Sequence, residues 1–141
     1  MRDDLHVNRV ILDTNVFVST AFNPQSASAR IIEAVRGGAL AMIWNMATRL
    51  ETQTVLTRIP PVSWDEVADL FLNQHRCDSN IDLLAVQFVS DPEDRKFAAL
   101  AQATGAMLVS SDKHLLEHRS LLDVCTPTEF LARVDTKQPS P

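Results

Sequence analysis

Tyrosine is absent from this sequence of 141 residues, and glycine occurs only three times. The glycines stand at positions 37, 38 and 105 and form no glycine-rich phosphate loop, which argues against a nucleotide-binding Rossmann module. With no tyrosine and two tryptophans, an aromatic platform for stacking nucleic-acid bases is not supported. The two cysteines, Cys77 and Cys125, stand far apart and form no metal or redox motif, so we expect free thiols.

The sequence also lacks the segments that carry a protein to or through a membrane. No apolar run approaches the ~20 residues of a membrane span. The opening MRDDLHVNRV holds acids where a signal peptide has basic residues. We therefore expect a cytoplasmic protein without a membrane partner. The net charge of −5 argues against a generally basic nucleic-acid-binding surface, but not against nucleic acid bound through metal ions at a cluster of acids.

Short apolar segments alternate along the chain with amphipathic ones. Strands are predicted at 10–12 (resuming at 16–18), 41–44, 107–109 and 124–125, while 83–89 is either a further strand or irregular. Helices are predicted over 29–36, 46–57, 92–104, 115–122 and 128–133, and from Ser63 onward, where Glu66 completes a capping-box pattern. This alternation predicts an α/β fold with about five parallel strands and helices on both faces. The length suits one domain, which we place at 7–134, followed by a flexible tail over 135–141.

Acidic residues stand where ligands bind in such folds, outside the carboxyl ends of the parallel strands. Asp13 follows the first strand, and Asp112 follows the segment 107–109. Asp94 lies in the first turn of the helix that leads into that segment, and Glu51 lies early in the helix over 46–57. We expect these four carboxylates to converge at one edge of the sheet, where they stay ionised together only if cations neutralise them. Oxygen ligands of this kind suit Mg²⁺ or Mn²⁺.

Each of these acids also has a purely local interpretation. Asp13 is also explained as a turn residue, and Asp112 as a helix cap. Asp94 is explained as an acid that interacts favourably with the helix dipole, and Glu51 as a solvated residue on a helix surface. A different metal site is offered by His114 and His118, four residues apart, although no glutamate follows the first histidine as in zinc proteases.

Four segments together resemble the motifs of PIN-domain proteins. Residues 11–18 form an apolar strand that ends in Asp13, followed by Thr-Asn and more apolar residues. Residues 45–56 place Glu51 before a Val-Leu pair, residues 91–98 place Asp94 at the acidic position of the third motif, and residues 108–116 place Asp112 before a Leu pair. The match runs from Val10 to about Leu131. The resemblance implies a three-layer α/β/α fold and a metal-dependent ribonuclease, most similar to the small bacterial PIN proteins that are toxins of toxin–antitoxin pairs.

The resemblance also implies roles for particular residues. In a ribonuclease of this kind, Asp13 and Asp94 bind Mg²⁺ or Mn²⁺ directly, and Asp112 and Glu51 bind it directly or through water. Asn15 and Ser110 then orient the ligands or waters. The family more often has threonine at the position of Ser110, which keeps the hydroxyl. The implied substrate is RNA, and the implied protein partner is an antitoxin.

Two surfaces and two other classes of protein stay open at this stage. The cations Arg49, Arg95, Lys96 and Lys113 flank the motifs and are either RNA contacts or ordinary solvated charges. The apolar residues Trp64, Phe71 and Leu72 form either a groove for a partner helix, a homodimer face, or part of the core. The alternatives to a ribonuclease are a non-catalytic PIN-fold module for binding or assembly, and an unrelated α/β binding domain whose acids merely cap helices.

Overall fold

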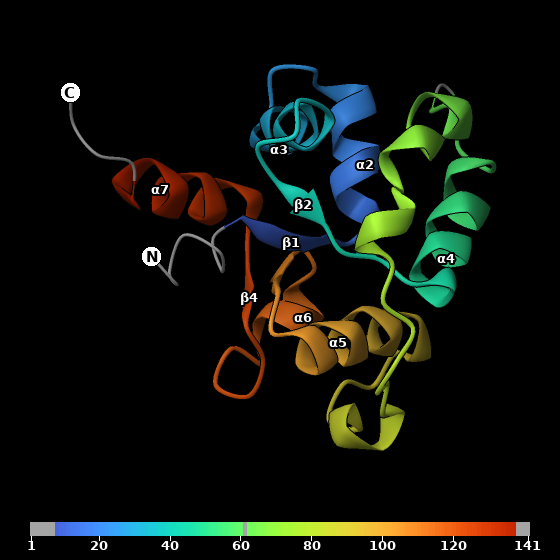
Figure 1. Cartoon of the computed structure of the whole chain (residues 1–141), viewed down its shortest axis with the longest axis vertical. Helices are drawn as coiled ribbons and strands as arrows, with labels where there is room; N and C mark the ends of the chain where they lie inside the picture. Colours follow the sequence, from blue (N-terminus) through green and yellow to red (C-terminus); the bar gives the residue numbers. More distant parts are fainter. Residues whose placement is uncertain (1–7, 61, 138–141) are drawn as a thin grey trace.

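Four parallel strands form the centre of the fold within the described residues, 8–60 and 62–137, of this computed structural model (Figure 1). Their order across the sheet is β2-β1-β3-β4, and each neighbouring pair is parallel. The strands are β1 (Arg9–Leu12), β2 (Ala41–Met42), β3 (Met107–Val109) and β4 (Val124–Cys125). Val7, with which the predicted domain begins, and residues 138–141 of the predicted tail lie outside the described residues.

Helices cover both faces of the sheet. The α-helices are α2 (Thr14–Phe22), α3 (Ala27–Arg36), α4 (Met46–Leu56), α5 (Pro92–Thr104), α6 (Lys113–Leu116) and α7 (Pro127–Lys137). The 3₁₀ helices are η1 (Trp64–Glu66), η2 (Ala68–Leu70), η3 (Asn73–His75) and η4 (Leu83–Val86). Within the described ranges, no helix has the length and apolar character to cross a membrane.

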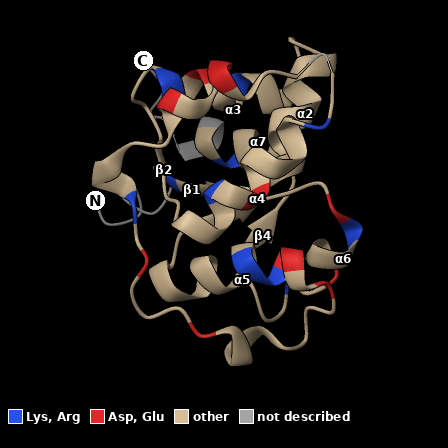
Figure 2. Cartoon of the chain, turned by 90° about the vertical axis from the view of Figure 1, so that its right-hand side faces the viewer, with Lys and Arg blue, Asp and Glu red and all other residues tan. Residues whose placement is uncertain are grey.

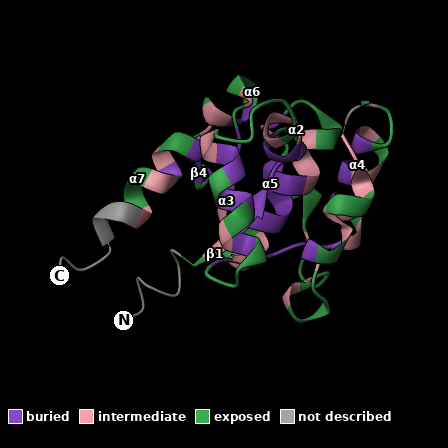
Figure 3. Cartoon of the chain, turned by 90° about the horizontal axis from the view of Figure 1, so that it is seen from above, coloured by how far each residue is buried: buried purple, intermediate pink, exposed green. Residues whose placement is uncertain are grey.

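Successive residues of β1 pack into two separate cores, as expected when side chains of a strand alternate between the faces of a sheet. Val10 and Leu12 pack with α2, α3 and α7, whereas Ile11 packs with α5 and α6. Buried residues accordingly concentrate on the strands and on α2, α3 and α5 in the middle of the molecule (Figure 3). This arrangement confirms the predicted three-layer α/β/α fold.

The sheet is smaller than the predicted sheet of about five strands. The segment 83–89 contains η4 instead of a strand, because the Asp82 side chain accepts a hydrogen bond from the Leu84 amide (3.0 Å) and turns the chain. Leu84 is 73% exposed, which a central strand does not allow. An isolated parallel bridge joins Trp44, two residues after the end of β2, to Arg76, and it lies outside the four strands.

The segment 16–18 is part of α2, so the prediction that the first strand resumes there is wrong. Its valines favour a strand locally. Asp13 nevertheless lies at the N-cap of α2, and the Val16 amide donates to the Asp13 carbonyl (2.9 Å), which starts the helix at once. Val16 and Phe17 then enter the core while Asn15 faces solvent, a pattern that tertiary packing imposes over local propensity.

Three other helices differ from their predicted form. The helix expected from Ser63 is divided into η1 and η2, and Ser63 makes no side-chain capping bond. The helix expected over 115–122 is α6, which begins earlier because Asp112 caps it and then continues as turns. α7 extends beyond the predicted 128–133. The predictions for 29–36, 46–57 and 92–104 are confirmed to within two residues at each end.

Candidate functional site

The ends of β1 and β3 lie side by side because these two strands pair directly, with Leu12 opposite Val109. The pairing continues one residue further, since the Asp13 amide donates to the Val109 carbonyl (3.1 Å). Asp13 follows β1 immediately and is 4% exposed. Asp112 follows β3 by three residues and caps α6 by accepting a hydrogen bond from the His114 amide (2.8 Å). The sheet therefore brings these two aspartates to the same edge.

Ser110 connects the two strand ends. Its hydroxyl donates to Asp13 Oδ2 (2.6 Å) and accepts from the Asp112 amide (3.0 Å). The residue is fully buried. The Asp13 side chain makes no capping bond to α2, and its carboxylate is held by the Ser110 hydroxyl together with the Thr14 backbone. The buried Ser110 hydroxyl thus orients the Asp13 carboxylate and binds the backbone of Asp112.

Asp94 interacts electrostatically with both of these aspartates from the first turn of α5. Its pKa is raised to about 7, first by burial and then by the charges of Asp112, Asp13 and Asp91. Burial also raises the pKa of Asp13, and the hydrogen bond from Ser110 opposes that effect. We refer to Asp13, Asp94 and Asp112 as the aspartate group. Its members resist simultaneous ionisation, which is the behaviour of carboxylates that lack a counterion.

Glu51, the fourth predicted acid, has other partners. It lies on α4, and its carboxylate approaches Lys96 Nζ on α5 (3.5 Å). Lys96 Nζ also contacts Glu93 Oε2 (3.0 Å). The pKa of Glu51 is raised by burial and then by the neighbouring Glu93. Within the described residues, no hydrogen bond or ion pair joins Glu51 to the aspartate group.

Three further residues bear on the predicted site. Asn15 is exposed in the first turn of α2, and among the residues described here its side chain has no hydrogen-bond partner. Thr14 and Thr52 are both buried and share a hydroxyl–hydroxyl hydrogen bond (3.1 Å) that joins the start of α2 to α4. Sequence reasoning missed this pair. Its only signal is a polar residue, Thr52, on the inner side of the helix that bears Glu51.

The donor set of the aspartate group suits a hard divalent cation, since carboxylate oxygens are the ligands that Mg²⁺ and Mn²⁺ prefer. The pKa of Asp94 is raised first by burial and then by the neighbouring aspartates, and a bound cation offsets both effects. In the described part of the chain, no three His, Cys, Asp or Glu side chains are gathered tightly enough to form a metal site. Mg²⁺ usually keeps several waters and takes one or two carboxylates, so the donors fit it without such a cage.

The four cations that flank the motifs differ in how they are engaged. Arg49 lies over the Trp64 ring (5.2 Å from Cζ to the centroid), and Arg95 donates to the carbonyls of Val89 and Ser90. Lys96 is paired with acids as described above. Lys113 is exposed and makes no ion pair or side-chain hydrogen bond with any described residue. Figure 2 shows acidic and basic segments next to one another on α5 and at α6.

Within the described residues, the two histidines of the alternative metal site belong to no group of three or more His, Cys, Asp or Glu side chains that could hold a metal ion. His118 packs its ring edge-on against Phe88 (5.0 Å between centroids), and its nearest acid is Glu117 (3.7 Å). His114 is exposed. These positions match ordinary surface histidines.

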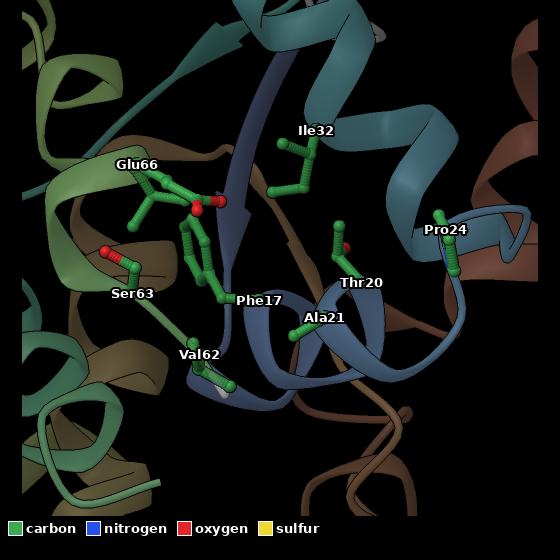
Figure 4. A pocket seen from close by; sticks show the side chains of 9 residues that line it. Phe17, Thr20, Ala21, Pro24, Ile32, Val62, Ser63 and Glu66 are labelled. Carbon is green, nitrogen blue, oxygen red and sulfur yellow. The ribbon is translucent and has the colours of Figure 1, made fainter. Parts of the chain in front are cut away.

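The predicted apolar patch divides between core and surface. Phe71 contacts Phe17, Trp44 and Trp64, with ring centroids 5.3 to 6.0 Å apart, so Phe71 and Trp64 pack against the core. Leu72 is 45% exposed. A pocket of about 350 Å³ lies nearby, where side chains of α2, α3 and the segment 62–67 point into one space (Figure 4). Phe17, Ile32 and Val62 line it, and none of the four predicted acids does.

A three-layer fold with aspartates at the carboxyl ends of neighbouring parallel strands defines a class of α/β proteins with an acidic edge. A family model for the PIN domain matches residues 9–114, a range that holds all four predicted acids. The chain therefore belongs to the PIN-domain family, whose members are generally nucleases that act on RNA and are typically metal-dependent. No significant match to a curated protein was found.

Proposed function

We propose that this protein is an endoribonuclease that uses Mg²⁺ or Mn²⁺ at the aspartate group. The observation that carries the proposal is the meeting of Asp13 and Asp112 at the ends of the paired strands β1 and β3, where the Ser110 hydroxyl donates to Asp13 Oδ2 and accepts from the Asp112 amide. The raised pKa of Asp94 beside them supports it. Membership of the PIN-domain family supports the same reaction class. A site that holds surplus negative charge attracts phosphodiesters only after a cation has reversed its local charge.

In this proposal the chain contributes ligands and their orientation. Asp13 and Asp94 bind the cation directly, Asp112 binds it directly or through water, and Ser110 holds Asp13 through the 2.6 Å hydrogen bond. A bound divalent cation supplies an acidified water and polarised phosphate oxygens. Lys113, exposed beside Asp112, is available to meet a substrate phosphate. Glu51 and Asn15 are proposed to act at the periphery of the site.

Cleavage of end-labelled single-stranded RNA tests the proposal. Wild type and the Asp94→Asn variant are compared in Mn²⁺, Mg²⁺ and EDTA. The matched control is Asp123→Asn, which removes an exposed carboxylate that lies outside the aspartate group. We expect cleavage by wild type and the control in either metal, and none in EDTA or by Asp94→Asn. Equal cleavage by wild type and Asp94→Asn would contradict the proposed site.

A non-catalytic PIN-fold module for binding or assembly is the second candidate. It is favoured by the finding that, in the part of the chain the structure describes, no three metal-ligating side chains form a ready group. The same RNA assay separates the two functions when Mn²⁺ binding by wild type is measured beside it. A protein that neither cleaves RNA nor binds Mn²⁺ is the module, whereas one that binds Mn²⁺ without cleaving this RNA is a ribonuclease of narrow substrate range.

We further propose that the protein is the toxin of a toxin–antitoxin pair, active in the cytoplasm. This finer proposal rests on the resemblance of the four motifs to those of small bacterial PIN toxins. Induced expression in a bacterial host tests it: wild type should slow growth, and Asp94→Asn should not. Growth unaffected by soluble, RNA-cleaving wild-type protein would contradict the toxin role. An antitoxin or a second copy of the chain is the proposed protein partner.

A further inference from the structure

Thr14 and Thr52 form a buried hydrogen bond between the start of α2 and the middle of α4. Their Oγ1 atoms are 3.1 Å apart, and either hydroxyl can be the donor. Thr14 is 6% exposed and Thr52 is 1% exposed. Between the described residues of α2 and those of α4, this is the one hydrogen bond. A single pair of hydroxyl groups therefore ties the first turn of α2 to α4.

The Thr52 hydroxyl is not explained by a bond within α4. The buried side of this helix carries Thr48, Thr52 and Leu56, spaced four residues apart along one face. The Thr48 hydroxyl is used at its own helix end, because it bonds the Asn45 amide (3.1 Å) and carbonyl (3.0 Å). Among the described residues, the hydrogen-bond partner of the Thr52 hydroxyl is Thr14. A buried hydroxyl is unfavourable unless it is hydrogen-bonded, and an aliphatic side chain would avoid that requirement. The contact with Thr14 is therefore the role that the hydroxyl of Thr52 fulfils.

Thr14 also contacts the aspartate group. It directly follows Asp13, and its backbone bonds the Asp13 carboxylate. The other partner of that carboxylate is the Ser110 hydroxyl (2.6 Å), which accepts a hydrogen bond from the Asp112 amide (3.0 Å). The Asp13 carboxylate is thus held from the β3 side by Ser110 and from the α2 side by Thr14.

These contacts form one chain of polar residues through the interior. It connects residues at the ends of β3 and β1 with α2 and α4, and its members are, in order, Asp112, Ser110, Asp13, Thr14 and Thr52. All of them except Asp112 are buried. No buried side-chain nitrogen or oxygen atom in the described part of the protein lacks a partner. In a buried polar network of this kind, the loss of one bond disturbs the groups on either side of it.

We propose that Thr52 is a positioning residue whose hydroxyl holds Thr14, and that it thereby keeps the Asp13 carboxylate in the orientation that binds a divalent cation. This inference rests on the proposed function, because it assumes that Asp13 is a cation ligand. Residues that orient metal ligands contribute about ten- to a hundredfold to metal affinity. Thr52 acts through one more residue than Ser110 does, so we expect a smaller contribution from it, about fivefold.

Mn²⁺ affinity, measured by the electron paramagnetic resonance signal of free Mn²⁺, tests the inference without an assay of activity. Thr52→Val removes the hydroxyl and retains the shape of the side chain, whereas Thr52→Ser retains the hydroxyl and removes a methyl group. We expect Thr52→Val to weaken Mn²⁺ binding by about fivefold, and Thr52→Ser to stay within about twofold of wild type. Thr52→Ser should nevertheless unfold at a lower urea concentration, because it leaves a small cavity in the core. Rescue by serine thus separates a positioning role from packing.

Control variants test whether the two hydroxyls act as a pair. Thr54→Val removes an exposed hydroxyl from the same helix and should leave the Mn²⁺ affinity unchanged. Thr14→Val should weaken binding as much as Thr52→Val, and the double variant should lose no more than either single variant, because all three break the same bond. Ser110→Ala removes a direct partner of Asp13 and should cause a larger loss, about tenfold or more.

Several results would overturn the inference. An unchanged affinity in Thr52→Val, with folding verified by circular dichroism, would make the hydrogen bond to Thr14 purely structural. A loss in Thr52→Ser as large as in Thr52→Val would assign the effect to packing, and losses that multiply in the double variant would mean that the hydroxyls act independently. If Thr52→Val does not fold, Thr14→Val and Thr14→Ser provide the same comparison from the other side of the bond. Absence of Mn²⁺ binding by wild type is a distinct result, because it overturns the proposed function itself together with the inference.

Discussion

Replacing Asp94 with asparagine should stabilise the metal-free protein at alkaline pH and not at acidic pH. Because the pKa of Asp94 is raised to about 7 in the folded protein, the folded state keeps this proton after the unfolded chain has released it. The free energy of unfolding therefore falls as the pH rises from about 4 to about 7, and the loss is complete above pH 7. An asparagine carries no such penalty.

The size of the effect follows from the same pKa. A carboxyl whose pKa moves from about 4 to about 7 on folding costs about 4 kcal/mol when fully ionised. Asp94 is only partly buried, and solvent screening reduces this figure. Its charge also interacts favourably with the N-terminus of α5, worth about 0.3 to 1 kcal/mol, which the variant loses. We expect a net gain of about 1 to 2 kcal/mol at pH 8 and none below pH 4.

Urea unfolding in EDTA at pH 4 and pH 8 measures this difference. The control is Glu93→Gln at the neighbouring position. The exposed carboxylate of Glu93 pairs with Lys96 Nζ (3.0 Å), and its pKa is lowered rather than raised, so Glu93→Gln should not gain stability at pH 8. The two adjacent acids should therefore respond differently, since only Asp94→Asn gains stability. A destabilised Asp94→Asn at pH 8, or an equal gain at both pH values, would refute the reasoning.

The remaining predictions concern the support of the site and the fold. Ser110→Ala removes the hydrogen bond to Asp13 and should cost about 1 to 3 kcal/mol in urea unfolding, while the exposed neighbour Ser111→Ala should stay within about 0.5 kcal/mol. Gly105→Ala forces a side chain onto a backbone with φ of 75° and should cost about 1 kcal/mol, whereas Gly37→Ala, at φ of −82°, should be nearly neutral; equal effects would contradict the helix-end geometry. Leu100→Ala should cost about 2 to 5 kcal/mol, because this side chain is fully buried between α5 and the sheet, and a smaller loss in thermal unfolding would place it outside the core.

Local signals predicted α5 well. Asp91 accepts a hydrogen bond from the Glu93 amide, Pro92 occupies the first turn, and Gly105 ends the helix with a left-handed backbone. Each of these roles depends on side chains within a few residues of one another, which is why the sequence alone suffices. A similar local signal was missed at α7. There the Thr126 hydroxyl and the Glu129 carboxylate cap each other's backbone amides, which starts the helix one residue before the predicted position.

The errors arise where distant contacts decide the structure. The valines after Asn15 favour a strand locally, but the core against α3 needs a helix there. The segment 83–89 has strand-like apolar residues but forms no strand. The residue that forms a parallel bridge with Trp44, just after β2, is Arg76, and no local sequence pattern predicts this contact. Long-range pairing of this kind depends on the whole sheet rather than on a window of sequence.

The candidate site divides in the same way. The four acids were identified from their positions after strands and at helix starts, and the structure brings Asp13, Asp94 and Asp112 into electrostatic contact. The bond between Ser110 and Asp13 depends on the register of β1 against β3. The association of Glu51 with Lys96 depends on how α4 meets α5. The spacing of the motifs specifies neither the strand register nor the contact between the two helices. The association of Glu51 with Lys96 and Glu93 was therefore not predicted.

A crystal structure of the protein soaked in Mn²⁺, with anomalous diffraction recorded at the manganese edge, tests the role of the aspartate group most directly. We predict one principal anomalous peak within coordination distance of Asp94 and at least one of Asp13 and Asp112, with Glu51 still paired to Lys96. A principal peak against Glu51 and Glu93, or no peak at saturating Mn²⁺ in crystals whose site is open to solvent, would contradict the metal-binding role of the three aspartates.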